Sequence, residues 1–592
     1  MRSRIVITGE GIVSAIGTDK AATLTSLREG KSGIGRMRYL QSRHHELPVG
    51  EVSLSDTEIK ALLGIAPSEE ISRNTLLGML AVGQALKEAG IERNQESGMI
   101  PRILLITGTT VGGMDITERH FDDMLTTGKA NPCLLKHGCG SSTDDIAAHF
   151  GLFSAHTTIS TACSSAANAL ILGAELLKAD EADIVVAGGM EALTRFHLNG
   201  FHSLMILDQE PCRPFDAQRA GLNLGEGAAF VVMEREADAQ ERGAAVHAWL
   251  SGYGNACDAF HQTASSENGE GAFLAMREAL EMARLTPGDI DYINAHGTGT
   301  PNNDLSETAA LRRVFAEQMP PVSSTKGFTG HTTSASGSIE AVICMLAMRH
   351  RFLPSNLRWA HQMPGGITPT LGGQGRALRH VLCNAFGFGG NDTALILSAQ
   401  PADEGLPSSS SEVRQPVIAA KVEITSEEEL AEIRRYVKPL EARRLGRIMK
   451  SALLSSLKAM EQAGVSCPDA IITATSLGCL EYSELLLMQL REEGEVMLKP
   501  TWFMQSTHNT IGSAVAIHTG CHGYNVTYTQ GAQSLEWALW DARRLIRSGR
   551  ARSVLVGMHD ETTPRFRSMM EQLGARDLCP IHSIAMILTC GE

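Results

Sequence analysis

The sequence predicts an α/β protein in which buried strands alternate with helices. Short β-branched runs occur at 4–8, 102–109, 183–189 and 292–298, and stretches with apolar residues at helical spacing occur at 75–90 and 271–285. This alternation is typical of sheets covered by helices on both faces. The 58 glycines fall mostly where a strand passes into a helix or a loop.

The chain of 592 residues is long enough for two to four domains. Residues 400–416, QPADEGLPSSSSEVRQP, are rich in Ser, Pro and charge and are interpreted as an exposed linker. All candidate catalytic motifs lie before this linker, and none lies in residues 417–592.

Composition and charge exclude several classes of function. The formal charge of −14 argues against nucleic-acid binding, and no apolar run approaches the roughly 20 residues of a membrane helix. Glu10 interrupts the N-terminal segment, which therefore resembles a strand and turn rather than a signal peptide, and a cytoplasmic location is expected. The 12 cysteines form no CxxC pair, which favours reduced thiols and argues against a metal site.

An internal repeat links the two parts of the chain. Residues 526–563 align with 157–194 without a gap, and SAVAIHTG at 513–520 lies under DDIAAHFG at 144–151 at the same offset. The C-terminal unit is therefore predicted to be a diverged copy of residues 70–195. Cys163 in the first copy is replaced by Ala532 in the second.

Cys163 is the candidate nucleophile. It follows the strand-like HTTIST at 156–161 and precedes a helix whose first turn consists of small residues, so the positive end of the helix dipole is expected to lower its pKa. Taken alone, this cysteine is better explained as a buried packing residue. His296 in NAHGTGTPNND, and Lys326 and His331 in SSTKGFTGHTTSASG, lie in glycine-flanked turns and together favour a catalytic site.

Residues 1–400 resemble an elongating β-ketoacyl-[acyl carrier protein] synthase, a condensing enzyme of the thiolase fold. The matching stretches, in the order of that family, are VITGEGIVSAIG, TACSSAANAL, RPFDAQRAGLNLGEGAAFVVME, NAHGTGTPNND, STKGFTGHTTSASG and NAFGFGGND. The resemblance implies a layered α-β-α-β-α fold with two similar halves, 1–250 and 251–399, followed by the linker 400–416 and a third half at 417–592.

The same resemblance implies the roles of individual residues. Cys163, His296 and His331 would be catalytic, Lys326 would adjoin them, and Glu340 would be its ionic partner. Phe388 would supply a backbone N–H, with that of Cys163, to an oxyanion, and its ring would gate the acyl pocket.

The implied reaction is decarboxylative condensation of an acyl-cysteine with a malonyl thioester. The partner is an acyl carrier protein, whose phosphopantetheine carries the acyl groups, and no cofactor or metal is needed. A histidine at 331 favours elongation over the Cys-His-Asn priming enzymes and over thiolases. The pathway stays open between fatty-acid, aryl-polyene and polyketide synthesis, and the competing function is a non-catalytic chain-length or scaffold partner of another synthase.

The C-terminal unit resembles truncated, cysteine-less synthase N-terminal-like domains. We expect either a homodimer through the first-half face or an intrachain pseudo-dimer, in which residues 523–529 meet 156–161. In the intrachain arrangement Trp502, Phe503 and Met504 would form part of the acyl-pocket wall, unless they are ordinary core residues of their own domain.

Overall fold

The computed structural model describes residues 4–92, 101–316, 318–401, 415–574 and 578–591. Most of the predicted linker, residues 402–414, lies outside the described residues. None of the described helices is long and apolar enough to cross a membrane.

A mixed sheet of 15 strands runs through the described part of the chain. Its order is β10-β9-β13-β14-β8-β1-β7-β6-β4-β5-β17-β16-β18-β19-β15. The strands of the first half are β1 (Ile5–Ser14), β4 (Ile103–Gly108), β5 (Ala155–Ile159), β6 (Ile184–Glu191) and β7 (Gly227–Arg235). Those of the second half are β8 (Ala248–Cys257), β9 (Tyr292–Asn294), β10 (Val322–Ser323), β13 (His380–Gly387) and β14 (Asn391–Ser398). Those of the C-terminal unit are β15 (Pro416–Ile424), β16 (Ala470–Ala474), β17 (Tyr524–Tyr528), β18 (Ser553–Glu561) and β19 (Ile581–Cys590).

Helices cover the sheet on both faces and form a middle layer, which confirms the predicted layered fold. The central helices α6 (Ser165–Lys178) and α12 (Ser336–His350) are almost entirely buried and pack on each other. A Cβ at Gly337 would lie 2.8 Å from the Cβ of Ala167, so this position needs glycine for the two helices to approach. On the outer faces, α3 (Arg73–Ala89) covers the first half, α9 (Glu270–Ala283) the second and α14 (Arg447–Ala463) the C-terminal unit.

The turn that carries the nucleophile occurs three times. Ala162, Thr333 and Gly531 have φ of 51°, 40° and 53°, and each lies three residues before a helix: α6, α12 and α18 (Ser534–Arg547). Positive φ is unusual for Ala and Thr, so the turns at Ala162 and Thr333 store backbone strain, whereas Gly531 adopts the same φ without it. Cys163, Ser334 and Ala532 follow the three turns, so the C-terminal unit keeps the geometry of the turn without its thiol.

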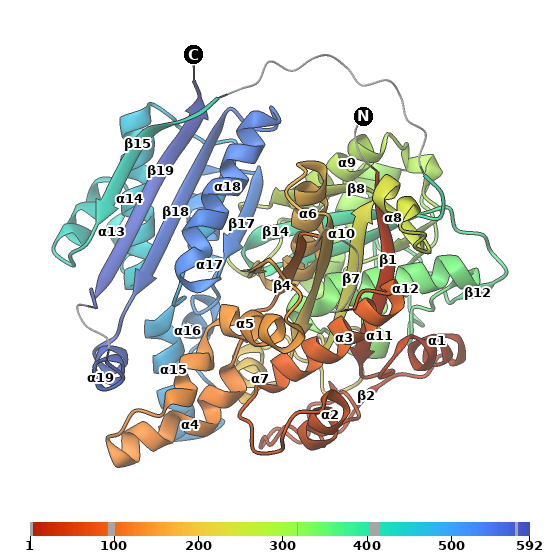
Figure 1. Cartoon of the computed structure of the whole chain (residues 1–592), viewed down its shortest axis with the longest axis horizontal. Coiled ribbons are helices and arrows are strands. Elements are labelled where there is room, and N and C mark those ends of the chain that lie inside the picture. Colours follow the sequence, from red (N-terminus) through yellow and green to blue (C-terminus); the bar gives the residue numbers. More distant parts are fainter. Residues whose placement is uncertain (1–3, 93–100, 317, 402–414, 575–577, 592) are drawn as a thin grey trace.

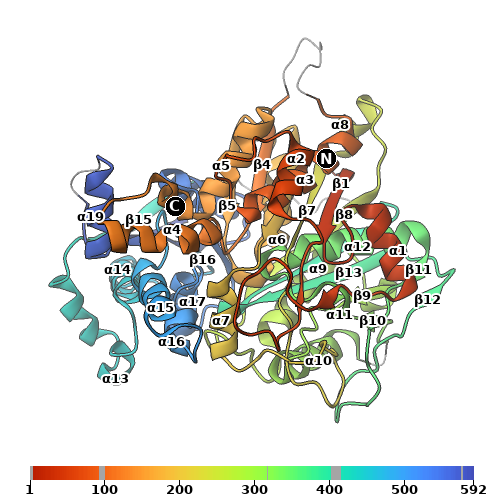
Figure 2. The same cartoon turned by 90° about the horizontal axis from the view of Figure 1, so that it is seen from below.

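The C-terminal unit joins the first half edge to edge within the chain. We call the contact between β5 and β17 the seam; the two strands pair antiparallel, with Tyr528 opposite Ile159. The N–H of Ser160 donates to the carbonyl of Thr527, and the N–H of Thr529 to that of Thr158, both at 2.9 Å. The strand order on one side of the seam repeats in reverse on the other, and Figures 1 and 2 show the blue strands beside the N-terminal ones. The sequence left two arrangements open, a homodimer and an intrachain pseudo-dimer, and the structure has the intrachain one.

Charged and amide side chains also cross the seam. The Arg544 guanidinium on α18 lies 2.6 Å from the Glu175 carboxylate on α6, and Arg550 lies 3.3 Å from the same group. Burial opposes ionisation of Glu175, but the two arginines outweigh it and lower its pKa to about 2. Gln530 accepts a hydrogen bond from the Thr158 hydroxyl and donates to Asp144, both at 2.7 Å, so this residue beside Ala532 has a structural place at the seam.

Candidate functional site

Cys163 lies in the short 3-10 turn η2 (Ala162–Ser164) between β5 and α6. It is 5% exposed. The N–H of Thr161 donates to the Ser165 hydroxyl at 2.8 Å, which closes the turn around the cysteine. β5 ends just before this turn, and Ala162, with its left-handed φ, reverses the direction of the chain. The thiol of Cys163 therefore points toward the histidines of the second half.

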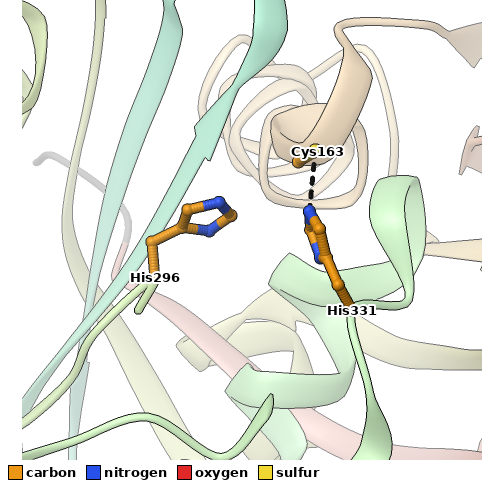
Figure 3. Close-up of side chains that lie close together, drawn as sticks. All are labelled: Cys163, His296 and His331. Atoms are coloured by element: carbon orange, nitrogen blue, oxygen red, sulfur yellow. Dashed lines mark hydrogen bonds between the residues drawn. The ribbon is translucent and has the colours of Figure 1, made fainter. Parts of the chain in front are cut away.

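The structure brings Cys163, His296 and His331 together, as Figure 3 shows. Nε2 of His331 lies 3.1 Å from Sγ of Cys163, and the two imidazole rings are 5.3 Å apart at 82°. One donor atom from each of the three residues lies within 4.8 Å of the others, a spacing that would also fit a metal ion. Cys163 thus shares one buried site with two histidines that lie more than a hundred positions later in the chain.

Backbone and side-chain contacts fix both histidines. His296 follows β9, and its backbone N–H donates to the Glu307 carboxylate on α10 (Pro301–Phe315) at 2.8 Å. Nδ1 of His331 lies 3.1 Å from the Ser336 hydroxyl. When Nδ1 carries the proton and donates to Ser336, Nε2 is free to accept a proton from the thiol.

A buried ion pair lies next to the histidines. Nζ of Lys326, at the start of α11 (Lys326–Thr329), is 2.6 Å from the carboxylate of Glu340 on α12. The side chains are only 1% and 2% exposed, so each charge depends on the other. Burial raises the pKa of Glu340 to about 7 although Lys326 opposes the shift.

Burial sets the protonation of the reacting groups. It lowers the pKa of His296 and of His331 well below the usual range, and the positive charge of Lys326 lowers both further. Burial also raises the pKa of the Cys163 thiol to about 12, against the opposing effects of Lys326 and the Phe388 N–H. The expectation that the helix dipole would lower this pKa was wrong, because desolvation of the thiolate is the larger effect.

Phe388 closes the site from the side of the second half. It begins the turn η5 (Phe388–Gly390) after β13, its N–H faces the thiol, and its ring stacks on Phe201 of α7 (Arg195–Ser203) at 5.6 Å and 22°. Both rings line a cavity of about 400 Å³ that also exposes Cys163, His296 and His331. All three proposed reacting groups can therefore be reached by one substrate.

Two polar residues at this site were not singled out from the sequence. Glu191, at the end of β6 and 2% exposed, accepts from the N–H of Thr110 and the hydroxyl of Ser334, and so ties the two halves together. Asn509 of the C-terminal unit donates to the carbonyl of Phe388 at 2.7 Å. The repeat offered a signal for Glu191, because Asp560 occupies the same position in the second copy and accepts from the N–H of Ser476.

The charge of Lys326 is expected to set the lower pH limit of Cys163 reactivity. Lys326→Met removes a charge that keeps His296 and His331 neutral, so their pKa values rise and they become protonated at higher pH. The rate at which iodoacetamide alkylates Cys163 is measured by mass spectrometry as a function of pH. The pH below which this rate falls should rise by about one unit. The exposed Lys31→Met is the control, and an unchanged pH in Lys326→Met would contradict the assigned electrostatic role.

Comparisons with known proteins agree with this geometry. A family model for the beta-ketoacyl synthase N-terminal domain matches residues 2–239, one for the C-terminal domain matches 247–359, and a second N-terminal model matches 419–592. The 3-oxoacyl-[acyl-carrier-protein] synthase 2 of Vibrio cholerae is 31% identical over 412 residues, which are 67% of this chain and 99% of that protein.

Two solved structures resemble this chain, and they cover different shares of its length. The ishigamide ketosynthase/chain length factor is 31% identical with a TM-score of 0.63, over 68% of this chain and 100% of that one. The PfaC keto synthase-chain length factor, 16% identical, shares the fold over 99% of this chain and 78% of its own, with a TM-score of 0.77. The chain therefore belongs to the beta-ketoacyl synthase family, and it carries that family's N-terminal domain twice.

Proposed function

We propose that the chain is an elongating β-ketoacyl-[acyl carrier protein] synthase that acts in fatty-acid, aryl-polyene or polyketide-type synthesis. The observation that carries this proposal is the 3.1 Å contact between the protonated thiol of Cys163 and a neutral His331, with His296 in the same cavity. A nucleophile beside a base, with a second imidazole facing the same space, fits acyl transfer followed by carbon–carbon bond formation.

In the first half-reaction Cys163 accepts the acyl group from the phosphopantetheine of an acyl carrier protein. With a pKa of about 12 the thiol needs a base, so its proton passes to Nε2 of His331 as Sγ attacks the thioester carbon. The Sγ–C bond forms, the C–S bond to the carrier breaks, and the leaving thiolate takes the proton. The N–H groups of Cys163 and Phe388 stabilise the tetrahedral oxyanion.

In the second half-reaction a malonyl thioester loses carbon dioxide, and its C–C bonding pair becomes an enolate. Neutral His296 and His331 donate hydrogen bonds to the enolate oxygen, each worth about 3 kcal/mol when well placed. For this step His331 is in its other tautomer, with the proton on Nε2 and with Nδ1 accepting from the Ser336 hydroxyl. The enolate carbon then attacks the acyl carbon, the new C–C bond forms as the Sγ–C bond breaks, and Cys163 leaves as a thiolate that takes up one proton from water. Burial keeps both imidazoles neutral, and Lys326 contributes through its charge, which lowers the pKa of both further.

Acyl transfer to Cys163 is the direct test of this function. Intact-protein mass spectrometry after incubation with acyl carrier thioesters should show one acyl adduct, and Cys163→Ala should abolish it. Cys467→Ala, which removes an exposed thiol, is the control and should keep the adduct. A thiol that stays unmodified across many donors would instead support the non-catalytic scaffold.

Phe503 of the C-terminal unit is proposed as a wall of the acyl pocket. It is 1% exposed, and its ring lies 5.3 Å from that of Phe201 and 5.9 Å from that of His197. A Cβ on Gly200 would lie only 2.1 Å from the Phe503 ring, so the glycine makes room for it. Trp502 is only partly buried against the same apolar cluster as Phe503 and packs under Lys499 at 4.3 Å, and Met504 lines a different cavity with Leu440. Of the expected three-residue wall, Phe503 is the residue whose ring contacts Phe201.

Phe503→Ala should lengthen the product. Removing the ring opens space beside Phe201, and the chain can then extend further before it meets the seam. Product chains released from the carrier protein and analysed by mass spectrometry should gain at least one two-carbon unit. Trp502→Ala is the matched control because its side chain faces Lys499; unchanged chain length in Phe503→Ala would remove this role.

The covered first-half edge predicts that the chain works as a single-chain pseudo-dimer. Because β17 already pairs with β5, that edge is unavailable to a second copy. Light scattering should give a mass near 63.5 kDa. A homodimer whose copies cross-link through cysteines introduced in 155–159 would contradict this arrangement.

A further inference from the structure

A small cavity between the first half and the C-terminal unit is lined by several polar side chains. We call it the seam cavity; its volume of about 20 Å³ is enough for roughly one water-sized atom. Its lining residues are Thr110, Val111, Met114, His137, Phe196, His197, Leu477, Cys479, Ser483, Ser506, Thr507 and His508. Both the first half and the C-terminal unit supply imidazoles and hydroxyls to it, whereas enclosed spaces that hold alkyl chains are lined by apolar side chains.

The three histidines of the seam cavity are neutral. Burial lowers the pKa of His137 and of His508 to about 4, and it lowers that of His197 as well. Each ring can therefore both donate and accept a hydrogen bond at neutral pH. Nε2 of His508 lies 3.9 Å from Sγ of Cys139, and its Nδ1 lies 3.5 Å from the Ser160 hydroxyl, so both contacts are long.

Two of these rings have an unused nitrogen. Nδ1 of His137 lies 2.8 Å from the Thr117 hydroxyl, and Nδ1 of His197 lies 3.0 Å from the Thr194 hydroxyl. Among the residues that the structure describes, neither Nε2 has a hydrogen-bond partner, and both keep accessible surface. His197 is only 8% exposed, so its free nitrogen faces an enclosed space rather than bulk water.

Helix α7 and Phe503 separate the seam cavity from the cavity that exposes Cys163. Ser160, which contacts His508, is three residues before the nucleophile. His197 and Phe201 are one turn apart on α7; His197 lines the seam cavity, and Phe201 lines the cavity that exposes Cys163. Phe503 contacts both residues, so a chain that ends against Phe503 has the seam cavity at its side.

An alkyl tail in this position would be unfavourable. It would cover the free imidazole nitrogens without replacing their hydrogen bonds, and leaving a buried polar group unpaired costs about 1–3 kcal/mol. An oxygen atom on the tail fits the volume of the cavity and can bond to these nitrogens. Sites built to bind a substrate oxygen discriminate strongly against the analogue that lacks it.

We propose that the seam cavity selects acyl groups that carry a hydroxyl or carbonyl oxygen near their distal end, with His197, whose Nε2 is unused, as the specificity-determining residue. This inference rests on the proposed synthase function, because it concerns the acyl group that Cys163 receives.

The test compares matched acyl donors on the full chain. Carrier-bound hexanoyl and octanoyl groups are compared with their counterparts that have an oxo or hydroxyl group on the penultimate carbon, and kcat/KM of Cys163 acylation is measured by mass spectrometry. We expect the oxygenated donor of at least one pair to react about tenfold faster. A ratio of threefold or less in every pair overturns the inference.

Variants then locate the selectivity. His197→Leu should bring the ratio to about one, and His508→Leu and Thr507→Val, the second of which keeps side-chain volume, should lower it. His582→Leu, on the far strand β19, is the control and should keep the ratio. A preference that survives in all three cavity variants overturns the assignment to this cavity. Absence of an adduct from every donor would overturn the synthase function itself, whereas adducts without preference overturn only this inference.

Discussion

The backbone pairing of β5 with β17 is the constraint on which the site depends. Cys163 lies four residues beyond the end of β5, so the position of the nucleophile follows from where that strand edge is held. The same pairing carries Asn509 to the carbonyl of Phe388 and Phe503 to the ring of Phe201. A unit without a nucleophile thus shapes both the oxyanion side of the site and the proposed end of its pocket.

Low polarity around the site determines how its groups share protons. Desolvation keeps the Cys163 thiol protonated and His296 and His331 neutral, while the buried cation beside them, Lys326, is balanced by Glu340. The resting site therefore contains a single ion pair set back from the reacting atoms. Charge is created only when a substrate arrives, next to the N–H groups and imidazoles that can stabilise it.

The fold and the proximity of Cys163, His296 and His331 could be predicted from the sequence, because motif order and glycine-flanked turns can be recognised locally. It was insufficient for the pKa of Cys163, which depends on how completely the surrounding layers exclude water. It also failed to separate Phe503 from Trp502 and Met504, since adjacent residues on a short helix point in different directions. Asn509 and His508 matter through contacts across the seam, and no pattern within either copy reveals them.

The contact between Cys139 and His508 has a consequence for how this protein can change. The two residues are 369 positions apart, the same separation as Cys163 and Ala532, so they are equivalent positions that face each other across the seam. In an assembly of identical copies, one codon would set both sides of such a contact, and every substitution would be made twice. Here each side is encoded separately, and a pocket wall can be altered without touching its counterpart beside the nucleophile.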